Sequence, residues 1–247
     1  MELNALNPIS PIAGRYWSQL ECLAPSFSEF GLIRYRVRVE VAYFLFLAEK
    51  KIIKLPASVK PAKLRAIYEQ FTEEDALKIK ATERITNHDV KAVEYFLKDK
   101  LKELGAGDSV EWIHFGLTSQ DINNTSIPLL WKEALEEQFL PLLFNLHLKL
   151  YHMAVDWKNI PMLARTHGQP ASPTKLGKEL MVFVERLEGQ IEQLMNIPFA
   201  AKFGGATGNF NAHKVAFGDV DWEKFGNDFV NRKLGLERMQ YTPPIDR

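Results

Sequence analysis

A short stretch near the middle of the chain combines several side chains that can bind anions or move protons. Residues 164–171 read Ala-Arg-Thr-His-Gly-Gln-Pro-Ala, so a guanidinium, a hydroxyl, an imidazole and an amide follow one another closely. Imidazole titrates near neutral pH and is the side chain most often used for proton transfer. The stretch therefore predicts either an acid–base group at His167 or a polar loop in which His167 has no chemical role.

A second candidate lies in the N-terminal arm, where residues 10–16 read S-P-I-A-G-R-Y. Prolines and glycines punctuate residues 1–29, which predicts an irregular segment. Arg15 in such an arm is either solvated or turned towards an anion by the flexible Gly14, since a guanidinium suits phosphate and carboxylate groups.

The third candidate is Asn87-His88-Asp89, at the predicted start of a helix. Asn87 is expected to be the N-cap, which places His88 and Asp89 in the first helical turn. The helix dipole is a sufficient structural reason for Asp89. It gives no reason for His88, so a neutral imidazole that contacts a ligand remains an alternative to a bland structural role.

The fourth candidate is Thr118-Ser119-Gln120-Asp121, which resembles a capping box before another helix. Capping alone explains Thr118 and Ser119. The same geometry, with N–H groups and hydroxyls at a helix start, can also bind an anion. Taken together, the four stretches favour proton transfer on a small polyanion and, because the histidines are scattered, no metal site.

The elements that must position these residues are helical in period. Apolar side chains recur at steps of three and four in every long segment, and no alternating strand pattern is evident. The predicted helices cover residues 31–50, 57–71, about 88 to 104, 119–156, 174–196 and 219–235. A further helix is expected to begin at Thr72-Glu73-Glu74-Asp75, which resembles a capping box. Pro128 and Pro141 are expected to kink or break the longest of them. The fold class is therefore all-α, with a domain at 1–108 and part of a helix bundle at 109–247.

Composition excludes several classes of protein. Basic and acidic residues balance at 31 each, which argues against bulk electrostatic binding to nucleic acid or membranes. A single cysteine, Cys22, rules out an intrachain disulfide. Neither a signal peptide nor a membrane span is evident, so a soluble cytoplasmic protein is expected.

Four motifs taken together resemble the adenylosuccinate lyases, a family within the fumarase/aspartase superfamily. They are S-P-x-x-G-R-Y at 10–16, T-N-H-D-V-K at 86–91, L-T-S-Q-D-I-N-N at 117–124 and R-T-H-G-Q-P at 165–170. The T-S-x-D and T-H-G-Q-P motifs are shared by much of the superfamily. The other two are typical of the bacterial type of adenylosuccinate lyase.

The resemblance implies an enzyme of purine biosynthesis, a carbon–nitrogen lyase that releases fumarate by β-elimination. Its substrates are adenylosuccinate, which yields AMP, and the succinocarboxamide ribotide. His167 matches the family's general acid, and the residues that match substrate-binding positions are Arg15, Tyr16, Asn87, His88, Asp89, Thr118 and Ser119. The resemblance further implies no cofactor, no metal, and a homotetramer whose sites are shared between subunits.

The sequence departs from the family's pattern in three respects. Ala13 stands in place of an aspartate, and Pro244 in place of a glutamine that contacts substrate. The serine loop that carries the family's general base, with its G-S-S-x-M-P-x-K-x-N pattern, is not among the 247 residues. The chain is therefore expected to supply the acid but not the base, and to expose an unpaired apolar stripe, for instance at Leu176, Leu180, Phe183 and Leu187, that favours self-association.

Two alternatives remain open at this point. One is another lyase of the superfamily, such as a fumarase, an aspartase or an argininosuccinate lyase. The other is a helical scaffold that keeps the fold and has no activity.

Overall fold

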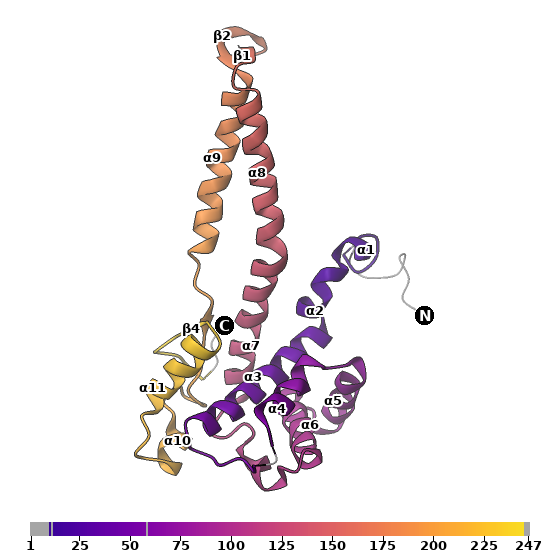
Figure 1. Cartoon of the computed structure of the whole chain (residues 1–247), viewed down its shortest axis with the longest axis vertical. Helices are drawn as coiled ribbons and strands as arrows, with labels where there is room; N and C mark the ends of the chain where they lie inside the picture. Colours follow the sequence, from indigo (N-terminus) through magenta and orange to yellow (C-terminus); the bar gives the residue numbers. More distant parts are fainter. Residues whose placement is uncertain (1–9, 11, 58, 245–247) are drawn as a thin grey trace. The chain divides into compact units, whose positions relative to one another are not determined.

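The computed structural model describes residues 10, 12–57 and 59–244, which fall into two compact units (Figure 1). The core unit consists of Met1–Glu133 together with Phe199–Arg247. The hairpin unit consists of Ala134–Pro198. The boundaries between the two units lie at 133–134 and 198–199, not at 108–109. The two domains expected from the sequence stay a prediction about the complete fold. None of the described helices combines the length and apolar character that a membrane crossing requires.

The core unit is helical, and its first part contains most of the helices. They are α1 (Trp17–Leu20), the 3-10 helix η1 (Glu21–Leu23), α2 (Ala24–Phe27), α3 (Glu29–Glu49), α4 (Pro61–Glu69), α5 (Glu73–Thr86), α6 (Asp89–Glu103), the 3-10 helix η2 (Gly107–Trp112) and α7 (Ser119–Ala134). The part of the arm after Tyr16, expected to be irregular, instead forms the short helices α1, η1 and α2.

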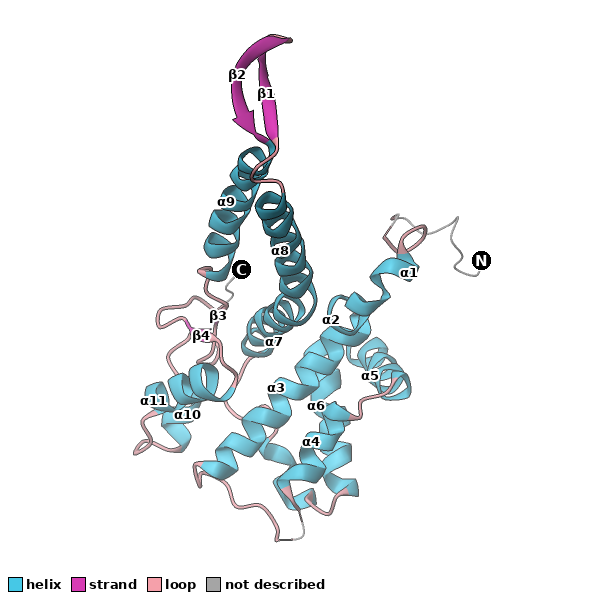
Figure 2. Ribbon diagram, turned by 45° about the horizontal axis from the view of Figure 1, so that its top comes forward, coloured by secondary structure: helices cyan, strands magenta, loops and turns pink. Residues whose placement is uncertain are grey.

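The second part of the core unit returns after the hairpin unit with shorter elements. They are β3 (Ala200–Ala201), α10 (Asn211–Ala216), α11 (Trp222–Asn227), the π-helical segment η4 (Asp228–Lys233) and β4 (Glu237–Arg238). The two short strands pair in parallel, with Ala200 opposite Glu237 (Figure 2). This pairing joins the two ends of the returning segment to each other.

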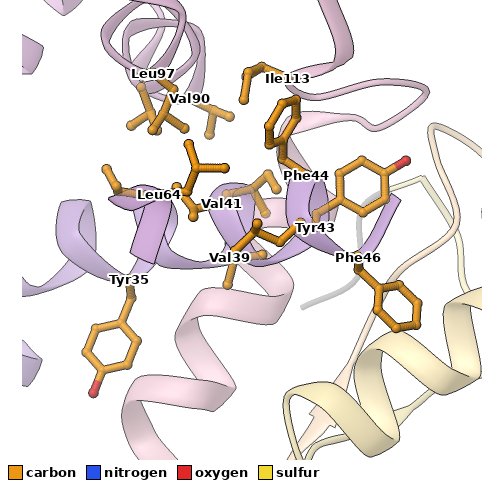
Figure 3. Close-up of a cluster of buried hydrophobic side chains, with 14 of the residues drawn as sticks. Tyr35, Val39, Val41, Tyr43, Phe44, Phe46, Leu64, Val90, Leu97 and Ile113 are labelled. Atoms are coloured by element: carbon orange, nitrogen blue, oxygen red, sulfur yellow. The ribbon is translucent and has the colours of Figure 1, made fainter. Parts of the chain in front are cut away.

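Helix α3 is the centre of the core unit. Its N-cap is Ser28, whose hydroxyl accepts a hydrogen bond from the Gly31 N–H at 3.1 Å. The sequence predicts one apolar face, but the helix is buried on nearly every side, because α4, α5 and α6 all pack against it. Figure 3 shows its side chains meeting those of neighbouring elements; the labelled residues are Tyr35, Val39, Val41, Tyr43, Phe44, Phe46, Leu64, Val90, Leu97 and Ile113.

One predicted helix start is confirmed and one is wrong. The capping box before α5 is present, because the Asp75 N–H donates to the Thr72 hydroxyl at 3.2 Å and the Thr72 N–H to the Asp75 carboxylate at 3.3 Å. Asn87 is not the N-cap of α6. It ends α5 in the left-handed conformation, with φ 52°, and His88 is the N-cap instead. Asparagine suits both positions, and a left-handed helix end is one of the few places where it competes with glycine.

The long helix predicted over 119–156 is interrupted between its two parts. The π-helical segment η3 (Leu135–Phe139) separates α7 from α8 (Leu140–Asp156). Pro128 lies inside α7 without ending it, whereas Pro141 lies in the first turn of α8. Proline has no N–H to donate, and Pro141 lies just after the π-helical segment, where the regular α-helical hydrogen bonding is already interrupted.

The hairpin unit contains α8, a pair of strands and α9 (Leu176–Met195), in this order along the chain. The strands are β1 (Pro161–Thr166) and β2 (Gln169–Lys175), which pair antiparallel (Figures 1 and 2). Residues 164–171 are therefore a β-hairpin and not the loop that the sequence predicts. Helices α8 and α9 lie side by side and approach closely at Gly177, where a Cβ atom would clash with the Ala154 carbonyl oxygen.

Candidate functional site

The arm that carries Arg15 and Tyr16 is exposed. Both side chains are open to solvent, and the Arg15 guanidinium lies 5.4 Å from the centre of the Tyr16 ring. Stacking of this kind occupies the face of the guanidinium and leaves the N–H groups at its edge available to an anion. Within the motif at 10–16, Pro11 lies outside the described residues.

His88 is held in one tautomer by its own helix. Its Nδ1 accepts a hydrogen bond from the backbone N–H of Lys91 at 3.1 Å. A backbone N–H can only donate, so Nδ1 carries no proton and the neutral ring carries its proton on Nε2. The side chain is about half exposed, at 47%. His88 therefore presents a neutral N–H donor at the start of α6.

Asp89 is used within the fold. One of its oxygens accepts from the Val90 N–H at 2.8 Å, and the other accepts from the Arg36 guanidinium at 2.6 Å. A carboxylate with both oxygens occupied is less suited to accept hydrogen bonds from a ligand. Two residues further on, Lys91 forms an ion pair with Glu94 at 2.6 Å.

The helix start at Thr118 and Ser119 is organised by Asp121. The Asp121 carboxylate accepts from the Thr118 N–H at 2.8 Å, which is the half of the predicted capping box that involves the acid. Thr118 and Ser119 are both half-buried, and Ser119 is the first residue of α7. Their hydroxyls and the remaining first-turn N–H groups are of the kind that binds carboxylates.

The same Asp121 also anchors the glycine-rich segment that follows β3. Asp121 and Lys202 are both buried and lie 2.6 Å apart, and the carboxylate also accepts from the N–H groups of Gly204 and Gly205 at 3.0 Å each. Pairing is what makes burial of both charges tolerable. Because Lys202 neutralises Asp121, the start of α7 does not present an unpaired negative charge to an anion.

A second buried charge cluster is formed by His114, which lies between η2 and α7, with Glu40 and Glu94. The His114 ring lies 2.5 Å from the Glu40 carboxylate and 3.8 Å from that of Glu94. Burial lowers the pKa of His114, but the charge and hydrogen bond of Glu40 and the charge of Glu94 outweigh it and raise the pKa above 6.5. An imidazolium there balances Glu40, which is completely buried.

His213, which the sequence analysis does not single out, is fully buried among aromatic rings of the core unit. Its Nε2 lies 3.0 Å from the Tyr43 hydroxyl, which donates its proton to the Phe115 carbonyl oxygen at 2.7 Å and so accepts from His213. Burial lowers the pKa of His213 to about 4, although the charge of Asp121 opposes the shift. A histidine that stays neutral and enclosed is a structural residue of the core, and only the packing reveals it.

His167 lies in the hairpin unit, whereas the other candidate residues lie in the core unit. It is exposed, and it occupies the two-residue turn between β1 and β2 together with Gly168. Their φ angles are 50° and 79°, the combination that a type I′ turn requires. The turn displays the imidazole at the end of the hairpin, whose register shifts between Leu163 and Arg165, and the ring makes no hydrogen bond to another described residue.

The described residues offer donors for anions and histidines for proton transfer. Within the described ranges, no three His, Cys, Asp or Glu side chains are grouped so that they could bind a metal ion. Hydrogen bonding, ion pairing and proton transfer are the chemistry that the donors and histidines described above offer. These are the means by which an enzyme eliminates a leaving group next to a carboxylate.

The chain belongs to the lyase family, because a model of that family matches residues 26–237. The family is part of the fumarase/aspartase superfamily, so the resemblance seen in the sequence motifs is confirmed. The chain is 53% identical over 255 residues to a Dictyostelium discoideum protein named adenylosuccinate lyase, and 46% identical over 250 residues to the protein of that name from Escherichia coli K12. It is covered completely in both comparisons but spans 55% of the length of each relative.

Solved structures confirm the all-α fold class. A fumarate lyase from Mesorhizobium sp. BNC1 superposes with a TM-score of 0.71 at 22% identity, covering 90% of this chain and 49% of that one. A 3-carboxy-cis,cis-muconate lactonizing enzyme from Pseudomonas putida gives 0.64 at 20% identity, covering 90% of this chain and 48% of its own. At these identities the likeness defines the fold and says nothing of the substrate.

Proposed function

We propose that these residues belong to a lyase that cleaves adenylosuccinate to AMP and fumarate. The observation that carries the proposal is the 53% identity, across the whole chain, to a protein named for that reaction. The motifs at 10–16 and 86–91 support the same substrate, because they distinguish this family from other members of the superfamily. The succinocarboxamide ribotide, which carries the same succinyl group, is the expected second substrate.

The reaction is an elimination in which every proton has a source and a destination. A base removes a proton from the succinyl carbon next to one carboxylate, and the electrons move into that carboxylate. Their return forms the double bond of fumarate and breaks the carbon–nitrogen bond. His167, as an imidazolium, then donates its proton to the departing nitrogen. Its exposure at the hairpin turn supports this role, since an acid must reach the leaving group directly.

The core-unit residues are proposed to bind the charged parts of the substrate. Arg15 and Tyr16 suit the nucleotide, because their guanidinium and ring can meet a phosphate and a base. Thr118 and Ser119 suit the succinyl carboxylates. Asn87 and the Nε2–H of His88 add neutral donors, and Asp89 holds this segment through Arg36. No cofactor or metal takes part in the proposal.

The partners proposed for this lyase are a nucleotide substrate and further copies of its own chain. In the hairpin unit, several apolar side chains of α8 and α9 are exposed, among them Leu142 at 70% and Phe183 at 58%. Surfaces of this kind are usually covered by another protein surface. A homotetramer in which helices of this unit bundle with those of other subunits accounts for them.

The test uses two proteins because the chain spans 55% of its relatives' length. One is the 247-residue chain, and the other is a chimera that continues it with the part of the Dictyostelium relative beyond the match. Each is mixed with adenylosuccinate, and the ultraviolet absorbance is followed. Cleavage by the chimera supports the proposal, whereas a folded chimera that cleaves argininosuccinate instead, or nothing, contradicts it. Cleavage by the chain alone means that a base lies within residues 1–247, which contradicts the expectation that the chain lacks it.

A further inference from the structure

Arg36 is a buried cation in the middle of α3 that the elimination itself does not use. Its side chain is 8% exposed, and it belongs to the central helix of the core unit. A guanidinium cannot lose its charge, so at this depth it must be paired and its fork must be matched by fixed acceptors. The identity of those acceptors therefore indicates what the residue holds in place.

The acceptors come from two segments that are far apart in the sequence. The Nη2 group donates to the Asp89 carboxylate at 2.6 Å, and Nε donates to the Asn123 side-chain oxygen at 2.8 Å. Asp89 follows the His88 N-cap directly. Asn123 lies four residues after Ser119 on α7, so it is one helical turn beyond the proposed carboxylate donors. One rigid group thus connects both segments.

We propose that Arg36 is a positioning residue that sets the separation between the His88 ring and the helix start at Thr118 and Ser119. The inference rests on the proposed function only in that these two segments bind substrate. Because the guanidinium is planar, its two bonds fix direction as well as distance. A lysine keeps the charge but is a single point donor on a flexible stem, so it cannot hold Asp89 and Asn123 at one fixed angle.

Arg38 provides a matched control on the same helix. Its guanidinium pairs with both oxygens of Glu133 at 2.7 Å, so it too makes a two-bond fork with an acid. Its side chain is 31% exposed, and its acceptor belongs to the far end of α7, not to either proposed substrate segment. If losing the two-bond arrangement of a guanidinium acts only through general stability, Arg36→Lys and Arg38→Lys should lower kcat/KM by similar factors.

The first experiment measures kinetics in the chimera for Arg36→Lys and Arg38→Lys. Misplacing binding groups by about 1 Å costs about 100-fold in rate, so Arg36→Lys is expected to lower kcat/KM by about that factor. Part of the loss is expected in kcat, because the transition state is held less well than the substrate. Arg38→Lys is expected to stay within about threefold. Equal losses in the two variants overturn the proposal.

The second experiment needs no activity. In the 247-residue chain, the nuclear magnetic resonance signals of the His88 ring report its tautomer and surroundings. Arg36→Lys is expected to shift these signals and Arg38→Lys to leave them unchanged. If the chimera is inactive, the proposed function fails, but this measurement still decides whether Arg36 positions His88. Unchanged His88 signals in a folded Arg36→Lys chain overturn the inference.

Asn123→Ala tests the same proposal if Arg36→Lys does not fold. Asn123→Ala removes one acceptor and leaves the Arg36–Asp89 ion pair, so no buried charge loses its partner. It is expected to lower kcat/KM in the chimera and to shift the His88 signals less than Arg36→Lys does. An Asn123→Ala chimera with kinetics equal to the parent shows that the bridge does not set the separation, which contradicts the proposal.

Discussion

The core unit and the hairpin unit treat polar and apolar groups in opposite ways. In the core unit, charges such as Asp121 and Lys202 are completely enclosed and paired with each other. In the hairpin unit, His167 is exposed at a turn, and apolar side chains such as Leu142 and Phe183 face solvent. The comparison indicates that the core unit encloses charges by pairing them with each other, whereas the hairpin unit presents its imidazole and the apolar side chains of its helices to solvent.

The largest expected effect concerns chemistry displayed by the hairpin unit. Replacing His167 in the chimera by Ala or Asn should lower kcat by about 100- to 10,000-fold, the usual contribution of a general acid. Asn tolerates the left-handed backbone found here, with φ 50°, so it separates the loss of the imidazole from damage to the turn. Steady-state rates with adenylosuccinate measure the effect. A loss below about threefold in both variants removes His167 from the role.

The next effect tests whether the core unit depends on its enclosed charges. Lys202→Met leaves Asp121 buried without its cation and should lower the free energy of unfolding by about 3–5 kcal/mol, as measured in urea. Adding Asp121→Asn removes the unpaired charge and should restore part of the loss. The exposed Lys178 of the hairpin unit is the control, since Lys178→Met should change stability by less than about 0.5 kcal/mol. Equal effects at the two lysines would break the comparison.

Two buried histidines of the core unit should give opposite dependences on pH. The pKa of His213 is lowered to about 4, so the unfolded chain binds its proton first, and stability falls as pH drops from 6.5 to 4. A pKa lowered from 6.5 to about 4 corresponds to roughly 3 kcal/mol. The pKa of His114 is raised above 6.5, so its contribution is complete below pH 6.5 and is lost as pH rises through the folded pKa.

Urea unfolding at several pH values separates the two histidines. His213→Gln keeps a donor for Tyr43 and should make the chain less sensitive to acid than the parent, while His114→Asn should reduce its sensitivity to alkali. Other carboxylates titrate equally in parent and variant, so the difference between them isolates each histidine. A parallel pH curve for His213→Gln and the parent contradicts the enclosed, neutral assignment.

The smallest change in stability, with a visible change in association, is expected on the exposed face of α8. Leu142 and Leu146 are 70% and 51% exposed and lie four residues apart, so they share one side of the helix. The double replacement by Lys should alter the unfolding free energy by less than about 0.5 kcal/mol and reduce self-association in sedimentation. Leu77→Lys in α5, at a site 68% exposed, is the control and should leave association unchanged.

Most of the helices were predictable because periodicity and capping are local. The Thr72–Asp75 box and the positions of α3, α4, α6 and α9 follow from spacing, whereas the division of residues 119–156 into α7 and α8 does not. The β-hairpin was not predictable in that way, since β1 and β2 are almost wholly exposed and carry no alternating pattern. Their pairing depends on the turn, where His167 and Gly168 both adopt positive φ.

The candidate residues were found through motifs, but the groups that hold them were not. Arg36 and Glu40 lie within an apolar helical pattern, and Lys202 pairs with Asp121 across 81 positions of sequence. Spacing cannot reveal such partners, because burial and the fold decide which charges meet. Asn87 shows the same limit on a smaller scale, since asparagine suits a helix end as well as a helix start.

The turn at His167 subjects one position to two independent kinds of selection. The left-handed backbone admits glycine, asparagine and aspartate readily and β-branched residues poorly. Proton transfer, by contrast, accepts few side chains besides histidine. A library covering every amino acid at position 167, sorted once for a folded hairpin and once for catalysis, should therefore yield two different sets of survivors. The two sets should share few residues. The turn should therefore still form with several side chains at position 167 that do not support catalysis.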